Sequence, residues 1–201
     1  DLIRDGEMIT VSCAEAETGK VYEGQADFDE KVVYLDKLPE TDIAPMLILA
    51  NPDKAFELSF YPNKGVGLLR MEFIISDSII FHPMALVKFN EMPNGPEKVA
   101  IEHMTAGYKS KTAYFVDKLA RSVAQVAAAF YPKDVIVRMS DFKTNEYASL
   151  LGGKFFEPHE ENPMLGFRGA SRYYNDRYRE GFKLECEAMK VVRDEMGLIN
   201  V

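Results

Sequence analysis

Short apolar runs that end near a charged side chain are the clearest pattern in this chain of 201 residues. Two of them, residues 65–73 and 135–142, are almost continuously apolar, are bounded by glycine or proline, and contain Arg70 and Arg138. Runs of this kind are typical of strands that are buried on both faces, as in a parallel sheet. Residues 46–50 form a similar run, so the pattern predicts three buried strands.

Helix-forming patterns lie between and after these strands. Asn51 suits a helix N-cap and Pro52 suits the first helical turn, which predicts a helix that extends to about Phe60. Residues 112–130 and about 176–196 carry apolar side chains at helical spacing. Each of these two stretches predicts a longer amphipathic helix.

The other segments of this part are less regular. Residues 74–111 predict loops with short helices, and residues 141–169, rich in glycine and proline, predict a loop. Repeated strand–helix units with parallel strands indicate an α/β fold, either a barrel or a doubly wound sheet. About three such units are predicted, which is too few to close a barrel of eight strands.

The start of the chain has a different pattern. Residues 7–23 predict two short strands around a turn at Gly19, as in the β-rich tail of a small domain. Residues 25–44 are acidic and have no sustained period, which is typical of a linker. The chain begins without methionine and stops at Val201 directly after a predicted helix, so we expect a piece of a longer protein.

Composition narrows the class of protein. A hydrophobic content of 47% is enough to bury a full core, and the net charge of -8 disfavours a nucleic-acid partner. No run approaches the length of a membrane span, so no membrane partner is expected. Cys13 and Cys186 lie far apart and match no metal or redox spacing. We interpret them as small buried side chains of a reduced, cytoplasmic protein.

The arginines near the ends of two strands are the best candidates for a binding site. A buried arginine is costly unless an anion meets it. Since Arg70 and Arg138 belong to one predicted sheet, they indicate a floor that holds a phosphate or a carboxylate. The alternative is structural: Arg70 would pair with Glu72 on the same strand face, and Arg138 with Asp141. Glu72 could be such a partner or a group that orients an arginine.

Several segments resemble one family of enzymes. They are residues 65–73 (Gly-Val-Gly-Leu-Leu-Arg-Met-Glu-Phe), 135–138 (Val-Ile-Val-Arg) and 161–168 (Glu-Asn-Pro-Met-Leu-Gly-Phe-Arg), with further support at 140–147, 151–153 and 157–163. These segments resemble the PEP-utilising enzymes, and the resemblance covers essentially the whole chain. It implies a C-terminal (β/α)8 barrel that binds pyruvate and phosphoenolpyruvate, preceded by a swivelling phosphohistidine domain.

The resemblance also implies a division of the chain. Residues 1–27 would be the end of the phosphohistidine domain and residues 28–44 a linker. Residues 45–201 would be the N-terminal part of the barrel, a partial TIM barrel of about three βα units.

Individual arginines acquire roles from the same resemblance. Barrel active sites lie at the C-terminal ends of the strands, where Arg70 and Arg138 fall. In the family, arginines at these positions bind the phosphoryl group and oxygens of phosphoenolpyruvate. Arg168 matches a further arginine near the site, with the alternative that it is a loop arginine that braces the surface, and Glu72 is the candidate orienting group. A guanidinium suits this task because its fixed fork stays charged and pairs bidentately with phosphate.

Other polar residues are interpreted as surface features. His82, His103 and His159 match no functional position of the family, so each is assigned to a loop or a helix surface. The acidic run 157–161 is interpreted as a solvated loop, because it has no companion ligands for a metal site.

The implied reaction converts ATP, pyruvate and water into AMP, phosphoenolpyruvate and phosphate through a phosphohistidine, with Mg²⁺ as cofactor. The phosphorylated histidine, the Mg²⁺ ligands, the ATP-binding domain and the cysteine that protonates the enolate would lie outside this chain. No catalytic or metal-binding residue is therefore assigned here, the chain alone is expected to be inactive, and a homodimer is expected. Two alternatives remain. One is a related phosphotransferase, such as enzyme I of the sugar phosphotransferase system or pyruvate phosphate dikinase. The other is a non-catalytic, dimerising piece that binds anions.

Overall fold

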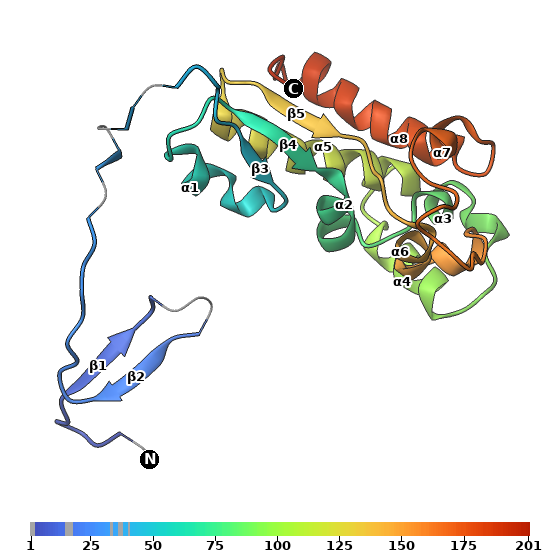
Figure 1. Ribbon diagram of the computed structural model, residues 1–201. Coiled ribbons are helices and arrows are strands. Elements are labelled where there is room, and N and C mark those ends of the chain that lie inside the picture. The colour runs from blue at the N-terminus through green and yellow to red at the C-terminus, as the bar shows by residue number, and fades with distance from the viewer. Residues whose placement is uncertain (1–2, 15–17, 33, 36–37, 40) are drawn as a thin grey trace. The chain divides into compact units, whose positions relative to one another are not determined.

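A computed structural model describes residues 3–14, 18–32, 34–35, 38–39 and 41–201 (Figure 1). The chain divides into two compact units, residues 1–39 and 40–201, and each is described by itself. Within the described ranges, none of the helices combines the length and the apolar content that crossing a bilayer requires.

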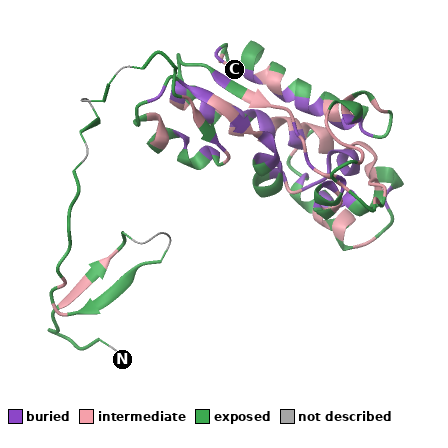
Figure 2. Cartoon of the chain, viewed as in Figure 1, coloured by how far each residue is buried: buried purple, intermediate pink, exposed green. Residues whose placement is uncertain are grey.

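The first unit contains a β-hairpin. β1 (Ile9–Ser12) and β2 (Lys20–Glu23) pair antiparallel, which confirms the two short strands predicted within residues 7–23. All of β2 is exposed and β1 is at most half-buried (Figure 2). Residues 15–17 of the predicted turn lie outside the described residues. The expectation that Cys13 is buried is wrong, because it lies exposed next to this thin hairpin.

The second unit is built on a parallel sheet. β3 (Leu47–Leu49), β4 (Val66–Arg70) and β5 (Val135–Arg138) pair in the order β3-β4-β5, which confirms the α/β class and the three predicted strands. The helical elements, with η for 3-10 and π turns, are η2 (Pro52–Lys54), α1 (Ala55–Ser59), α2 (Met71–Ile74), η3 (Ile75–Ile79), α3 (Pro83–Val87), η4 (Phe89–Glu91), α4 (Pro96–Met104), α5 (Lys111–Phe130), α6 (Thr144–Ser149), η5 (Gly153–Phe155), α7 (Ala170–Tyr174), α8 (Arg179–Lys190) and η6 (Val191–Glu195).

The long helix α5 supports the sheet. Ser110 caps its N-terminus by accepting a hydrogen bond from the backbone N–H of Ala113 at 3.0 Å. Leu119, Val123 and Phe130 are buried along one stripe, as helical spacing predicted. Figure 1 shows α5 crossing behind the strands, where it also packs against α1 and α8.

The predicted last helix is confirmed, with a less regular end. α8 runs into the π turn η6, and Gly197 follows with a φ of 70°, the left-handed conformation that glycine accepts most easily. Cys186 of α8 is exposed, so the interpretation of this residue as buried is wrong. The segment at 74–111 holds short helices joined by loops, as predicted.

The two faces of the sheet have different surroundings. Register-matched side chains form the face toward the helices: Leu49, Leu69 and Val137. On the opposite face Ile48 is 70% exposed and Ile136 is 54% exposed. The prediction that the strands are buried on both faces is therefore wrong for this chain. Because side chains alternate along a strand, Arg70 and Arg138 also belong to this uncovered face.

Gly65 permits a close approach at the start of β4. Its φ is +123°, and an added Cβ would lie 2.4 Å from the carbonyl oxygen of Asp134. The backbone N–H of Val66 donates to the same oxygen at 2.8 Å. Any side chain at this position would clash, so glycine allows the pairing that brings the starts of β4 and β5 together.

The end of β4 differs from the sequence prediction. The strand stops at Arg70, and the chain turns at once into α2, so Glu72 and Phe73 lie in a helical turn. The predicted strand had extended to Phe73. Glu72 therefore does not share a strand face with Arg70.

Candidate functional site

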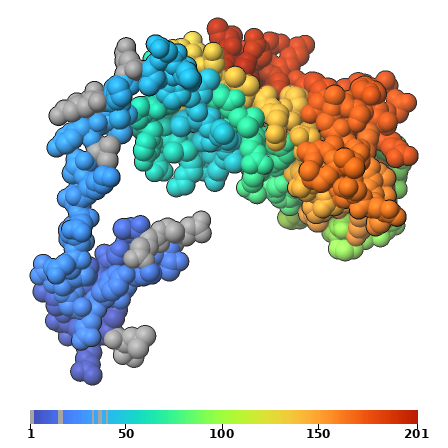
Figure 3. Space-filling view, in the orientation of Figure 1, coloured from blue at the N-terminus to red at the C-terminus, as the bar shows by residue number. Residues whose placement is uncertain are grey.

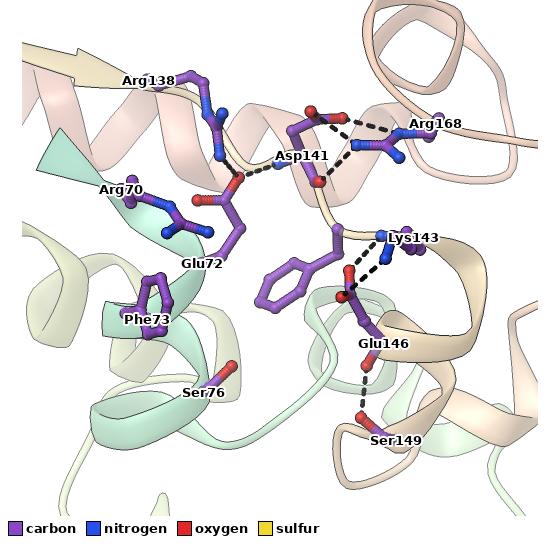
Figure 4. Close-up of a pocket in the computed structure, with 11 residues that line it drawn as sticks. Arg70, Glu72, Phe73, Ser76, Arg138, Asp141, Lys143, Glu146, Ser149 and Arg168 are labelled. Atoms are coloured by element: carbon purple, nitrogen blue, oxygen red, sulfur yellow. Dashed lines mark hydrogen bonds and ion pairs between the residues drawn. The ribbon is translucent and has the colours of Figure 1, made fainter. Parts of the chain in front are cut away.

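A cleft of about 430 Å³ opens at the carboxyl ends of β4 and β5 (Figure 4). It is lined by the end of β4, by α2 and η3, by the segment from β5 into α6, and by one residue of the loop before α7. Its lining residues are Arg70, Glu72, Phe73, Ser76, Arg138, Asp141, Phe142, Lys143, Glu146, Ser149 and Arg168. The structure thus brings together the four residues selected from the sequence: Arg70, Glu72, Arg138 and Arg168.

Arg70 and Arg138 are direct neighbours across the β4–β5 ladder. Adjacent strands lie about 4.8 Å apart, so the two positive side chains start close together, on the same face of the sheet and at its carboxyl edge. The guanidinium of Arg70 lies 4.4 Å from the ring centroid of Phe73. Within the described part of the chain no carboxylate forms an ion pair with Arg70, which leaves its donors available to an external anion.

Glu72 holds Arg138. Nη2 of Arg138 donates to Oε1 of Glu72 at 2.7 Å, and the same oxygen accepts the backbone N–H of Asp141 at 2.7 Å. The Glu72 side chain is only 9% exposed, against 40% for Arg138. Oε2 of Glu72 and Nε of Arg138 are buried without hydrogen-bond partners, so the pair keeps unused bonding capacity beside the cleft.

Arg168 forms an ion pair with Asp141. Its Nε and Nη2 atoms donate to the two carboxylate oxygens of Asp141 at 3.3 and 3.0 Å, and this bond raises the pKa of Arg168 above its ordinary value. Asp141 in turn donates its N–H to Glu72, so the contacts run continuously from Arg138 to Arg168. Both pairings considered from the sequence, Arg70 with Glu72 and Arg138 with Asp141, differ from those observed.

The charges of the cleft favour an anion. Lys143 and Glu146 approach to 3.9 Å, and Oε2 of Glu146 accepts the backbone N–H of Lys143 at 2.7 Å. The lining therefore holds four cationic side chains and three carboxylates, and each carboxylate already has a cationic partner. Arg70 is the cation of this lining that has no carboxylate partner among the described residues. The chain as a whole carries -8, so this is a local positive site.

A buried ionic cluster near the cleft escaped the sequence analysis. His82 is fully buried, and its Nε2 contacts Oε1 of Glu157 at 2.9 Å. Arg172 also pairs with Glu157. The interpretations of His82 as a surface residue and of Glu157 as part of a solvated loop are therefore wrong, whereas His103 and His159 are exposed as expected. No periodicity connects these three positions, and the one local signal was the proline that follows His82 and starts α3.

Glu185 of α8 is a second buried carboxyl near the cleft. It accepts hydrogen bonds from the backbone N–H of Ser140 at 3.1 Å, from the Ser140 hydroxyl, and from the Tyr178 hydroxyl at 2.8 Å. Burial outweighs these bonds and raises the pKa of Glu185 to about 7. The contacts fasten α8 to the residue that precedes Asp141.

The sequence matches one protein-family model, described as PEP-utilising enzyme, PEP-binding domain, over residues 31–201. Among curated proteins it is similar to the phosphoenolpyruvate synthases of Synechocystis sp. (52% identical over 202 residues), Deinococcus radiodurans (54% over 199 residues) and Escherichia coli (49% over 199 residues). These matches cover 99 to 100% of this chain and 25% of each relative. The chain thus spans about a quarter of the length of these relatives.

Proposed function

This chain belongs to the PEP-utilising enzymes, whose PEP-binding domain matches its residues 31–201, and from this premise we propose that it contains the substrate-binding portion of a phosphoenolpyruvate synthase. Such an enzyme converts ATP, pyruvate and water into AMP, phosphoenolpyruvate and phosphate through a phosphohistidine. Relatives of that name align with nearly the whole chain at about half identity, which supports this enzyme over the related phosphotransferases.

The observation that carries the proposal is the register-matched pair of arginines at the ends of β4 and β5. Phosphoenolpyruvate carries a phosphate and a carboxylate on three carbons, so it needs two or more cations within a small space. Among the described residues no carboxylate pairs with Arg70, and Nε of Arg138 is buried beside the cleft without a hydrogen-bond partner. Planar guanidinium forks recognise both anionic groups of this ligand.

The proposed chemistry explains why these positions are arginines. In the second half-reaction the enolate oxygen of pyruvate attacks the phosphorus of the phosphohistidine, and the P–N bond breaks as the new O–P bond forms. Enolate, carboxylate and phosphoryl charges converge, and the protein must neutralise them without reacting itself. In this proposal Arg70 and Arg138 bind phosphoryl and carboxylate oxygens. Arg168 supplies a third guanidinium at the side of the cleft, and Glu72 orients Arg138.

Mg²⁺ is expected for phosphoryl transfer of this kind, but the carboxylates of the cleft do not fit it. A magnesium site needs several oxygen ligands that are free to coordinate. Glu72, Asp141 and Glu146 are each paired with a cation, and no group of three metal-ligating side chains gathers among the described residues. We therefore assign no step to Mg²⁺ in this chain and propose that its ligands lie elsewhere in the protein.

The proposal extends to the architecture. We infer that residues 45–201 are the first three βα units of a (β/α)8 barrel, with residues 1–27 ending a phosphohistidine domain and 28–44 linking the two. The uncovered face of the sheet, with Ile48 and Ile136 exposed, supports this, because in a closed barrel that face would be the interior. Homodimerisation stays a prediction.

The test separates the two half-reactions in a full-length protein that carries this chain. Arg70→Ala and Arg138→Ala should each abolish the formation of phosphoenolpyruvate from pyruvate but leave ATP-dependent phosphorylation of the histidine largely intact. Arg121→Ala is a matched control, because Arg121 is an exposed arginine of α5 that pairs with Asp117. Survival of both half-reactions in the Arg70 and Arg138 variants would refute the assignment. Phosphotransfer to a small carrier protein without AMP formation would identify the phosphocarrier class instead.

A further inference from the structure

Arg172 of α7 is a buried charged residue close to the cleft but outside its lining. Its side chain is 1% exposed. The guanidinium lies 4.0 Å from the ring centroid of Tyr147 and 4.2 Å from that of Phe167, so it is enclosed by aromatic faces. A guanidinium in such a site is costly unless its donors are satisfied.

Every donor-bearing nitrogen of Arg172 has a partner. Nη1 and Nη2 donate to the two oxygens of Glu157 at 2.6 and 2.7 Å. Nε and Nη2 both donate to the backbone carbonyl oxygen of Phe167, at 3.0 and 2.8 Å. One side chain therefore joins α7 to two separate points of the preceding loop.

Glu157 is itself anchored to a rigid element. The backbone N–H of Met84 donates to Nδ1 of His82 at 3.1 Å, which places the ring proton on Nε2, facing Oε1 of Glu157 at 2.9 Å. Burial lowers the pKa of His82, which favours the neutral ring of this arrangement. Arg172, Glu157 and His82 thus form a brace from α7 through the loop to the start of α3.

The brace acts directly beside a cleft residue. Phe167, whose carbonyl Arg172 holds, is covalently followed by Arg168, and the N–H of Phe167 donates to Oε1 of Glu160 at 2.8 Å. The loop has little core of its own just before this point, since Leu165 is 85% exposed. Figure 3 shows this part of the chain, in orange, at one end of the second unit. The backbone that carries Arg168 is therefore held on its N-terminal side by contacts of Phe167, while the Arg168 carbonyl accepts a hydrogen bond from the Ser171 hydroxyl at 2.8 Å.

We propose that Arg172 is a positioning residue: braced by Glu157 and His82, it holds the Phe167 carbonyl so that Arg168 points into the anion-binding cleft. This inference rests on the proposed function, because Arg168 must contact the ligand for its position to matter. Arg172 itself does not line the cleft.

A double-mutant cycle on ligand affinity tests the inference. The variants are Arg168→Ala, Arg172→Lys and the two combined, in a full-length protein that carries this chain, with phosphoenolpyruvate as the probe in calorimetric titrations. Lysine keeps the charge but cannot hold both Glu157 and the Phe167 carbonyl with a planar fork. Arg168→Ala should weaken binding at least about tenfold, as expected for lost charge-assisted hydrogen bonds. Arg172→Lys should weaken it several-fold, and the double variant should bind no more weakly than Arg168→Ala alone.

Each other outcome is decisive. The positioning role would be overturned, and the proposed function left intact, by either of two results. One is a double variant whose loss of affinity equals the product of the two single losses, and the other is an unchanged affinity in Arg172→Lys. No loss in Arg168→Ala would remove Arg168 from the proposed site, and the inference would fall with it. A merely structural role would lower affinity through instability, whether or not Arg168 is present.

Folding is controlled in the same samples. ATP-dependent phosphorylation of the histidine should be retained in each variant. The matched control is Arg179→Lys, which makes the same substitution at an exposed arginine at the start of α8. If Arg172→Lys fails to fold, Glu157→Gln replaces it in the cycle, because it keeps the side-chain volume and removes one charge of the brace. We then expect that Glu157→Gln combined with Arg168→Ala binds phosphoenolpyruvate no more weakly than Arg168→Ala alone. If the fold-losses in affinity of the two single variants multiply in the double variant, the proposal is refuted.

Discussion

Removing Arg70 and removing Arg138 should have very different effects on stability, although the two arginines are neighbours in register. Arg138→Met leaves Glu72 buried, 9% exposed, with one backbone N–H as its remaining partner. Arg70→Met breaks no ion pair within the described residues and removes a positive charge from beside Arg138. The comparison therefore separates an arginine that is paired within the fold from one that is available for ligand.

The magnitudes follow from these contacts. Loss of a charged hydrogen-bond partner from a buried group costs about 1.5–3 kcal/mol, and the 40% exposure of Arg138 favours the lower part, about 2 kcal/mol. For a chain of this size that corresponds to a fall of about 4–8 °C in Tm. Arg70→Met loses a contact with Phe73 of about 0.5–1 kcal/mol, and relief of the repulsion from Arg138 offsets it. Its Tm should change by no more than about 2 °C.

Thermal unfolding of the 201-residue chain, followed by circular dichroism, measures both variants. The double variant Glu72→Gln with Arg138→Met is the internal control, because it neutralises the carboxylate that Arg138→Met leaves unpaired. It should recover at least half of the lost Tm. Equal losses for Arg70→Met and Arg138→Met, or no recovery in the double variant, would show that the reasoning about Glu72 is wrong.

Three further predictions concern other parts of the chain. Between pH 4.5 and about 7 the folded protein retains a proton on Glu185 that the unfolded chain has released, so stability should fall as pH rises through this window. Urea unfolding at several pH values measures the free energy of unfolding, and Glu185→Gln should remove up to about 3 kcal/mol of its change with pH. An unchanged slope of that free energy against pH would contradict the raised pKa. Gly65→Ala should cost at least about 2 kcal/mol in the same assay, whereas Gly95→Ala, with nothing near the added carbon, should cost under about 1 kcal/mol; similar losses would refute the close approach. Finally, a thiol reagent should label both Cys13 and Cys186 in the native protein, and protection of either thiol would restore the buried interpretation.

The strands and the two long helices could be predicted because their signals are local. Glycine- and proline-bounded apolar runs gave β3, β4 and β5, and helical spacing gave α5 and α8. The two arginines could also be selected from the sequence, since a charge at the end of an apolar strand needs an explanation. That they are neighbours in register depends on the sheet order, which the sequence alone does not state.

The partners of these arginines could not be predicted in the same way. The structural alternative placed Glu72 on the same strand face as Arg70, but β4 ends at Arg70 and the helical turn that follows carries Glu72 toward Arg138. His82, Glu157 and Arg172 meet only through tertiary packing, because each lies in a different segment; His82 and Glu157 had been assigned to the surface, and Arg172 had not been singled out. Burial of charge is decided by partners that are distant in sequence, which hydrophobic patterning does not encode.

The affinity of phosphoenolpyruvate for a full-length protein that carries this chain, compared with that of its Arg70→Met variant, tests the central claim most directly. Because Arg70 has no carboxylate partner among the described residues and its loss should leave stability nearly unchanged, a change in affinity can be attributed to the lost guanidinium. The account predicts that the variant binds at least about tenfold more weakly, with an unchanged Tm. Equal dissociation constants for the two proteins would contradict it.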